Sequence, residues 1–145
     1  MPWYQYSNFG GGLARPWVEA ILWNGSRFVR LTALVDSGAD SSVLDVSVAL
    51  RLGLMRAQAQ TRTGIATGGT TVTHLYWPNA PLHLQFGQDK FLFDGSFVET
   101  PTGTNPLNVL GRRDFFQRYV VQFWDAAQMF NIDLSPHFPR PSIKP

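Results

Sequence analysis

The chain has 145 residues, which predicts one domain that is large enough to bury a core. Hydrophobic residues make up 44% of the sequence and charged residues 15%, so a wholly disordered chain is excluded. Because there is no cysteine, disulfide scaffolds, cysteine-ligated zinc and thiol catalysis are excluded as well. A net charge of +2 from scattered arginines argues against a nucleic-acid partner, and no apolar stretch is long enough for a membrane span.

The first regular element that the sequence predicts is a β-hairpin. Residues 17–23 and 27–35 are apolar runs rich in β-branched and aromatic side chains, and they flank Asn24 and Gly25. Asn-Gly between two such runs indicates a type I′ turn, in which both central residues need positive φ.

Helical signal is sparse and short. Residues 45–52 can form two helical turns, with Asp45 near the N-cap and Gly53 as a left-handed stop after the last turn. Residues 112–118 follow a glycine and predict a second short helix.

The remaining elements are extended. Residues 82–86 alternate apolar and polar side chains, as a half-buried strand does. Further strands are predicted at residues 91–93, 97–99, 119–124 and 129–134. The fold class is therefore all-β, with one or two short helices. We expect an N-terminal segment at 1–13, the folded domain at 14–134 and a proline-rich tail at 135–145. On periodicity alone, a small β domain that only binds a partner is the leading interpretation.

Asp36 changes that interpretation. It stands directly after an apolar strand and is followed by Ser37 and Gly38, which offer a hydroxyl and closely spaced backbone N–H groups. A carboxylate at this position is costly unless it is hydrogen-bonded or paired. An Asx-turn at the end of a strand is the alternative explanation, since aspartate is common there.

Four segments together resemble the retropepsin-like aspartic proteases, the retroviral-type family with cellular and bacterial members. Residues 34–44 (LVDSGADSSVL) are similar to the active-site loop, and residues 108–112 (NVLGR) to the segment that precedes the family's short helix. Residues 15–18 (RPWV) resemble the entry to the first hairpin, and residues 63–70 (TGIATGGT) the glycine-rich flap. The resemblance implies an acid-protease barrel equivalent to half of a two-lobed pepsin-type fold. It also implies peptide hydrolysis without a metal or cofactor.

A single Asp-Ser-Gly motif supplies only half of such a site. Hydrolysis by activated water needs a base and an acid, and two carboxylates that share one proton provide both. The resemblance therefore implies a homodimer in which Asp36 of each subunit meets across a two-fold axis. The partners expected are a second copy of the chain and a peptide or protein substrate.

The resemblance also implies roles for individual residues. The implied catalytic set is Asp36, Ser37 and Gly38; the implied substrate-binding and flap set is Ala39, Asp40, Ile65, Ala66, Thr67, Gly68 and Gly69. Asp40 is expected to pair with Arg112, and Arg15 of the partner chain to join that ion-pair network. Aromatic side chains near the N-terminus, with the strand at 129–134, are the expected dimer surface, although core packing or a loose start explains them equally well. These aromatic residues are Trp3, Tyr4, Tyr6 and Phe9.

Two departures from the family pattern stand out. Arg113 separates the Gly-Arg pair from Asp114, which leaves the start of the second helix open, and Ala66 with Thr67 replaces glycine at the flap centre. An inactive dimeric module for peptide binding or assembly is the alternative function, and a nucleic-acid-binding barrel is a more remote one. No signal peptide is expected at the start of the chain. The compartment is left open, with a soluble cytoplasmic protein favoured.

Overall fold

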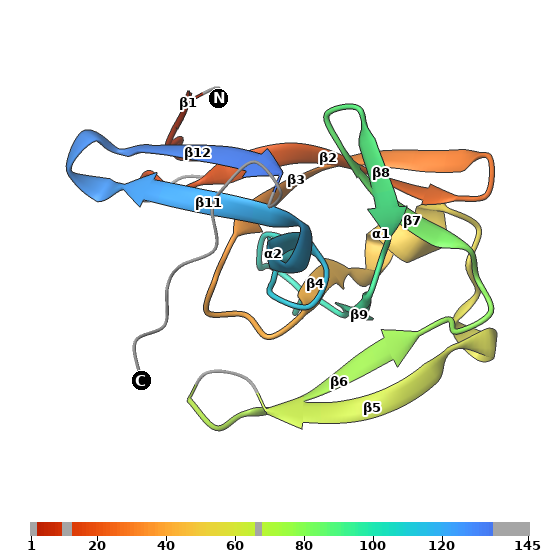
Figure 1. Ribbon diagram of the computed structural model, residues 1–145. Helices are drawn as coiled ribbons and strands as arrows, with labels where there is room; N and C mark the ends of the chain where they lie inside the picture. Colours follow the sequence, from red (N-terminus) through yellow and green to blue (C-terminus); the bar gives the residue numbers. More distant parts are fainter. Residues whose placement is uncertain (1–2, 10–12, 66–67, 135–145) are drawn as a thin grey trace, which may run out of the picture.

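The computed structural model describes residues 3–9, 13–65 and 68–134, and within them the chain is mostly β (Figure 1). The strands are β1 (Trp3–Gln5), β2 (Trp17–Asn24), β3 (Arg27–Val35), β4 (Ser42–Asp45), β5 (Gln60–Ile65), β6 (Thr71–Tyr76), β7 (Leu82–Phe86), β8 (Asp89–Leu92), β9 (Gly95–Val98), β10 (Val109–Leu110), β11 (Tyr119–Trp124) and β12 (Met129–Leu134). The helices are α1 (Val46–Arg51) and α2 (Phe115–Arg118), with short 3₁₀ turns at Arg56–Gln58 and Asp125–Ala127. The all-β prediction is confirmed.

Two sheets organise these strands. One has nine strands in the order β5-β6-β9-β4-β10-β3-β2-β7-β8 and curls around the core, and the other has three in the order β1-β12-β11. The hairpin β5–β6 projects below the body in Figure 1, and the hairpin β11–β12 extends to its left. In the described part of the chain, neither helix is long enough or apolar enough to cross a membrane.

The first hairpin forms as predicted, but its turn differs. Asn24 pairs with Arg27, so the loop consists of Gly25 and Ser26 rather than Asn24 and Gly25. Only Gly25 of these two has positive φ, at 60°. Glycine at the first central position with an ordinary second residue is the pattern of a type II′ turn, so the type I′ expectation is wrong. The strand register, which the local sequence does not reveal, decided the turn type.

Both helices have aspartate caps. The Asp45 carboxylate accepts the Ser47 N–H at 3.0 Å, and Gly53 follows α1 with φ of 82°, as predicted. The second helix is shorter than predicted, because Asp114 caps it and α2 begins only at Phe115.

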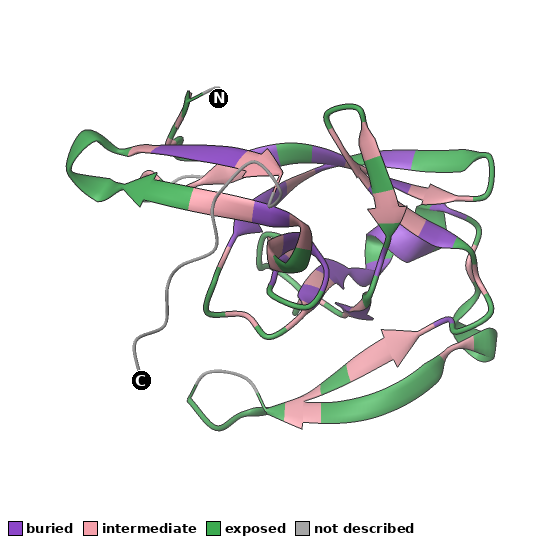
Figure 2. Cartoon of the chain, in the orientation of Figure 1, coloured by how far each residue is buried: buried purple, intermediate pink, exposed green. Residues whose placement is uncertain are grey.

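The core is built from alternate faces of the strands and from aromatic rings. Figure 2 shows buried residues along β2, β3 and α1, whereas β5 is mostly exposed. Phe115 is fully buried, and its ring centroid lies 4.8 Å from that of Tyr119 and 5.7 Å from that of Phe86. Burying a phenylalanine side chain contributes roughly 1.5–3 kcal/mol, so α2 is held mainly by this ring despite its four residues.

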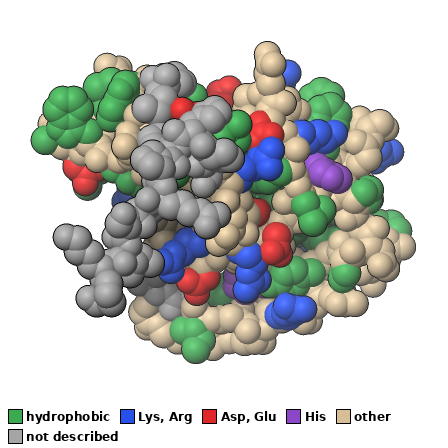
Figure 3. All heavy atoms as spheres, viewed as in Figure 1, with side chains coloured by type: hydrophobic (Ala, Val, Ile, Leu, Met, Phe, Trp, Pro, Cys, Tyr) green, Lys and Arg blue, Asp and Glu red, His purple; other side chains and the backbone are tan. Residues whose placement is uncertain are grey.

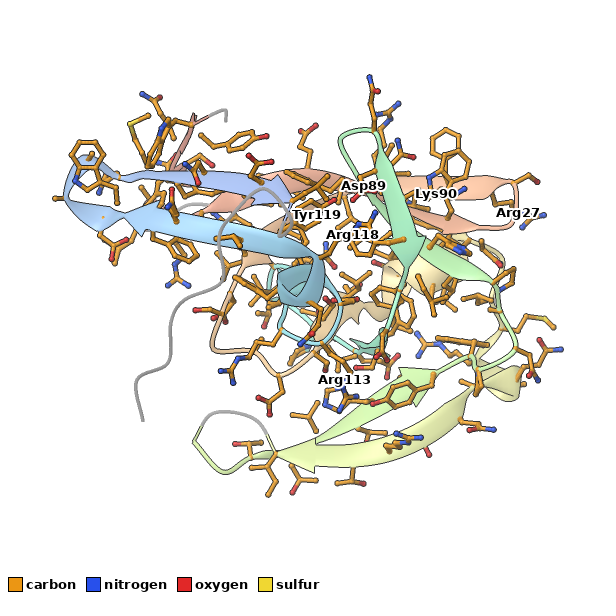
Figure 4. The ribbon with its side chains drawn as sticks, viewed as in Figure 1. Arg27, Asp89, Lys90, Arg113, Arg118 and Tyr119 are labelled. Carbon is orange, nitrogen blue, oxygen red and sulfur yellow. The ribbon has the colours of Figure 1, made fainter. Side chains whose placement is uncertain are left out.

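A charged cluster fastens the β7–β8 hairpin to the start of β11. Asp89 forms an ion pair with Arg118, and it accepts the Tyr119 hydroxyl at 2.6 Å (Figure 4). Strand β8 begins at Asp89, two residues before the strand predicted at 91–93. The Arg118 hydrogen bond is the main reason that the pKa of Asp89 is lowered.

The N-terminal segment packs on its own chain. Strand β1 pairs antiparallel with β12, and the ring of Tyr4 stacks on Phe130 with centroids 5.3 Å apart. Tyr6 also contacts Phe130, and its hydroxyl donates to Asp125 at 2.5 Å. Burial and this hydrogen bond raise the pKa of Tyr6 to about 12. Of the four N-terminal aromatics, Tyr4 and Tyr6 therefore belong to the fold of one chain.

Candidate active site

Asp36 lies at the point where β3 ends and the chain turns. Its backbone N–H donates to the Leu110 carbonyl at 3.0 Å, which fixes the residue to β10. Its carboxylate accepts the Gly38 N–H at 2.9 Å, and its carbonyl accepts the Ala39 N–H at 3.2 Å. The carboxylate contact is that of an Asx-turn, so this hydrogen bond fits the structural and the catalytic explanation equally. Asp36 is half-buried, whereas Ser37 and Gly38 are exposed, and the loop is open to a ligand or a partner.

Strand β10 brings two of the four motif segments together, residues 108–112 and residues 34–44. It is inserted between β3 and β4, parallel to the first and antiparallel to the second. Val109 pairs with both Leu34 and Val43, and Leu110 pairs with Val35, next to Asp36. Segments that lie far apart in the sequence therefore form one support beneath the Asp36 loop.

Gly111 allows this support to close. A Cβ atom at this position would lie 2.5 Å from the Ser41 carbonyl carbon and oxygen and 2.8 Å from the Ala39 oxygen. Beyond it, the Arg112 N–H donates to the Ala39 carbonyl at 2.9 Å, and the Arg113 N–H donates to Asp40 at 3.1 Å. The glycine is needed because the backbones approach more closely than any side chain permits.

A buried carboxyl group holds the underside of the loop. Asp114 is 6% exposed and accepts the Ser42 hydroxyl, whose oxygen in turn accepts the Gly111 N–H at 3.1 Å. Asp114 also accepts the backbone N–H groups of Asp94 at 3.1 Å and Phe115 at 2.7 Å. Burial raises the pKa of the Asp114 carboxyl above its usual value, although these donors oppose the shift. Helix α2 therefore begins after Asp114, three residues later than the predicted start at Arg112, and Asp114 is its N-cap.

This residue was missed as part of the site. The sequence shows Asp114 directly before the apolar pair at 115–116, and it shows Ser42 inside the Asp36 motif. Nothing local indicated that the two would meet, since they lie 72 positions apart.

The expected ion-pair residues lie at the edge of the loop. The Arg112 Nη1 and Asp40 Oδ1 atoms are 3.9 Å apart, and the two side chains are 64% and 94% exposed. An exposed pair of this kind contributes about 0–1 kcal/mol within one chain. Arg15 is held through its backbone, which exchanges hydrogen bonds with Ser7, and its proposed contact with a partner chain stays a prediction.

The β5–β6 hairpin carries the remaining site residues. Gly64 pairs with Val72 and Ile65 with Thr71, so the hairpin is regular up to its turn. Gly68 and Gly69 have φ of 91° and 83°, and the Ile65 side chain is 81% exposed. Ala66 and Thr67, the other two residues assigned to the flap, lie outside the described residues.

A groove separates this hairpin from the body. It has a volume of about 720 Å³ and is lined by β6, the neighbouring strands and the loop before β10. Apolar side chains that line it include Val43, Leu75, Val98, Leu107 and Val109. Residues 36–41 are not part of its lining, but Val43 and Val109 are, and Val109 pairs with Leu34, two residues before Asp36. Within the described ranges, no three histidine, aspartate or glutamate side chains come together as a metal site requires.

The aspartyl protease family model matches residues 19–111, more than half of the chain. The chain belongs to the aspartyl protease family. The matched region begins in β2 and ends at Gly111, so it contains the Asp36 loop, the β5–β6 hairpin and β10. The resemblance drawn from the sequence motifs is thereby confirmed, and the mostly β, curled half-barrel is the fold that it implied.

Among solved structures, the chain is similar to the EIAV protease complexed with the inhibitor HBY-793. The identity is 22%, the match covers 71% of this chain and 86% of that chain, and the TM-score is 0.48. Comparison with curated proteins gave no match.

Proposed function

We propose that this protein is a homodimeric aspartic endopeptidase in which Asp36 of each subunit activates one water molecule. The observation that carries the proposal is the position of Asp36 at the end of β3, braced by β10, inside the region that matches the aspartyl protease family. Since the chain has one Asp-Ser-Gly motif, the second carboxylate comes from a second copy.

The two carboxylates divide the proton transfers between them. Two carboxylates in close contact share one proton, because both cannot ionise. The ionised group accepts a proton from water as the water oxygen attacks the peptide carbonyl carbon. The protonated group donates to the carbonyl oxygen and forms a tetrahedral diol. Collapse of the diol transfers a proton to the leaving nitrogen and breaks the C–N bond.

The neighbours of Asp36 support this chemistry. The exposed Ser37 hydroxyl is free to bond across the two-fold axis and hold the carboxylates coplanar. Gly38 has no Cβ, so a substrate backbone can approach its carbonyl, and Ala39 and Asp40 continue the same contact surface. The Asp40–Arg112 pair lies at the subunit edge, where Arg15 of the partner would desolvate it and strengthen it.

The β5–β6 hairpin, called the flap from here, closes over the substrate. Its β6 residues line the groove, and its turn contains two glycines with positive φ. An extended substrate in this groove would place alternate side chains against the apolar wall. Closure would exclude water from the carboxylate pair.

The dimer surface that we propose lies on one side of the molecule. The loop between β3 and β4, the C-terminal end of β5 and the tip of the β11–β12 hairpin all face left in Figure 1. Hydrophobic side chains gather over that hairpin tip in Figure 3. Trp124 is 56% exposed, Trp3 45% and Phe123 40%, and the rings of Trp3 and Trp124 are 6.2 Å apart. Phe9 is also exposed, and its ring contacts Trp17.

The decisive experiment is peptide-library cleavage read by mass spectrometry at pH 4, 5.5 and 7. Asp36→Asn should reduce cleavage by at least about 10²–10⁴-fold, because it removes the acid and base pair. The matched control is Asp94→Asn, which changes an exposed aspartate outside the loop and should cleave normally. Sedimentation of both variants should show the same dimer. A dimeric wild type that cuts nothing would favour the peptide-binding module instead.

A further inference from the structure

A polar side chain of the flap forms a hydrogen bond with the body of the protein. His74 lies in β6, and its Nδ1 atom is 2.7 Å from the hydroxyl of Ser96 in β9. Ser96 is 1% exposed, so this hydrogen bond satisfies a buried hydroxyl. Either imidazole tautomer can form it, because the hydroxyl both donates and accepts.

The backbone attachment at this point is slight. Strands β6 and β9 share one registered pair, Leu75 with Phe97, and β5 lies outside β6 at the edge of the sheet. By comparison, β2 and β3 share eight registered pairs. The His74–Ser96 hydrogen bond, next to the Leu75–Phe97 pair, therefore forms a large share of the polar contacts that join the flap to the body.

The absence of a side chain at Gly64 leaves room for the His74 imidazole. A Cβ at this position would lie 2.9 Å from His74 Nε2 and 3.1 Å from Cδ2. Gly64 lies in β5 without a left-handed φ, so its backbone conformation does not require glycine. The requirement comes from the imidazole on the central strand β6, whose Nε2 side lies against Gly64 of β5 and whose Nδ1 atom meets Ser96 of β9.

We propose that His74 is a positioning residue that sets the angle of the flap over the groove, by bridging Gly64 of the flap and Ser96 of the body. The inference rests on the proposed protease function for its effect on substrate, but the bridge itself does not. His74 touches no reacting atom in this scheme. It acts through the flap, because Thr73 and Leu75 on either side of it line the groove.

The expected effect follows from the strength of one hydrogen bond. Losing a net 0.5–1.5 kcal/mol shifts an open–closed equilibrium by about 2- to 12-fold. If only the closed flap binds substrate tightly, KM rises by that factor while kcat changes less.

The first test is hydrogen exchange of the flap amides, which needs no substrate. His74→Phe keeps a ring but loses the bond, and Ser96→Ala removes the other partner. Both should speed exchange of the β5 and β6 amides about 2- to 12-fold and leave β2 and β3 unchanged. His74→Asn, whose amide nitrogen can occupy the place of Nδ1, should restore protection. His83→Phe, a histidine change in β7, is the matched control and should have no effect on the flap.

A double-mutant cycle tests the ring itself. Gly64→Ala should loosen the flap in the wild type, because the added methyl displaces the imidazole, and should add nothing in His74→Ala. Additive effects, unchanged flap exchange in His74→Phe, or equal acceleration in the body and the flap would each overturn the proposal.

The catalytic arm compares KM and kcat for a peptide substrate. A rise in KM with little change in kcat for His74→Phe, and rescue by His74→Asn, would support positioning, whereas equal loss of kcat would contradict it. If the wild type cleaves no peptide, the protease proposal fails, but the exchange experiment still decides whether the bridge exists.

Discussion

The Asp36 loop and the flap face each other across the proposed site, but they are held in opposite ways. Backbone hydrogen bonds from β10 and the segment after it fix the loop, and the buried Asp114 holds its underside through the Ser42 hydroxyl. In the described residues, the flap joins the body through one registered strand pair, the His74–Ser96 hydrogen bond and the packing of Leu75 on the core. Acid–base chemistry requires carboxylates at a set separation, whereas substrate entry requires a part that moves. Buried contacts lie under the Asp36 loop, whereas the flap is mostly exposed.

The sharpest way to break this comparison is to add one methyl group to each region. Gly111→Ala should lower the free energy of unfolding by about 2–4 kcal/mol, since the methyl meets backbone atoms at 2.5 Å. Gly68→Ala should cost only about 1–2 kcal/mol, from its φ of 91° alone, because no atom lies within 4 Å. Urea unfolding measures both. Equal costs would show that the loop is no more tightly packed than the flap.

The next largest effect is expected at Asp114. Asn in its place would turn an amide N–H toward the Asp94 N–H, at a cost of about 1–3 kcal/mol. The raised pKa means that the folded state binds the proton more tightly than the unfolded state. The stability from that proton is fully present below pH 3.8 and is lost as pH rises through the folded pKa.

The cost of Asp114→Asn should therefore be largest in acid and should shrink toward neutral pH. Unfolding of wild type and variant from pH 3 to pH 8 measures this difference. A cost that grows with pH would mean that the ionised carboxylate, not the neutral acid, holds the loop.

Asp89 should respond with the opposite sign. Its pKa is lowered by Arg118, so its contribution is present above pH 3.8 and is lost as pH falls through the folded pKa. Asp89→Asn should cost about 1 kcal/mol at pH 7 and nothing at low pH, a modest value because the Arg118 side chain is 41% exposed. The same unfolding series, run on this variant, checks it. A cost that does not change with pH would show that the Asp89–Arg118 ion pair does not contribute to the free energy of unfolding.

The smallest effect on stability is expected at Ile65 in the flap. Because its side chain is 81% exposed, Ile65→Ser should change the free energy of unfolding by less than about 0.5 kcal/mol. If the closed flap buries this side chain against the substrate, the variant loses that burial, and its KM should rise by about 10-fold. Leu92→Ser, at a 66% exposed position in β8, should leave KM unchanged. An unchanged KM for Ile65→Ser would indicate that this side chain does not meet the substrate.

The elements that could be predicted from the sequence are those determined by neighbouring residues. The first hairpin and α1 could be placed because Gly25, Asp45 and Gly53 act on their immediate neighbours. Local signals could not give the turn type, because it depends on strand register. They could not give the Asp89–Arg118 pair either, since its members are 29 positions apart.

The candidate site divides in the same way. The loop at Asp36 and the segment at Gly111 were found through family resemblance, and β10 shows how they meet. Asp114 was missed because its partner Ser42 lies in a different segment, and the inserted Arg113 obscured its alignment. Docking of β1 on β12 of the same chain was unforeseen for a related reason: strand pairing is decided by the whole sheet.

The two-residue strand β10 also sets an order for folding. Asp36 emerges from the ribosome long before residues 108–112, yet its backbone is anchored by Leu110. Contacts between segments this distant in sequence form slowly, because a long loop must close first. The Asp36 loop therefore gains its final shape only when most of the chain has been synthesised. A nascent or truncated chain that ends before Gly111 would carry the Asp-Ser-Gly motif without the support that aims it.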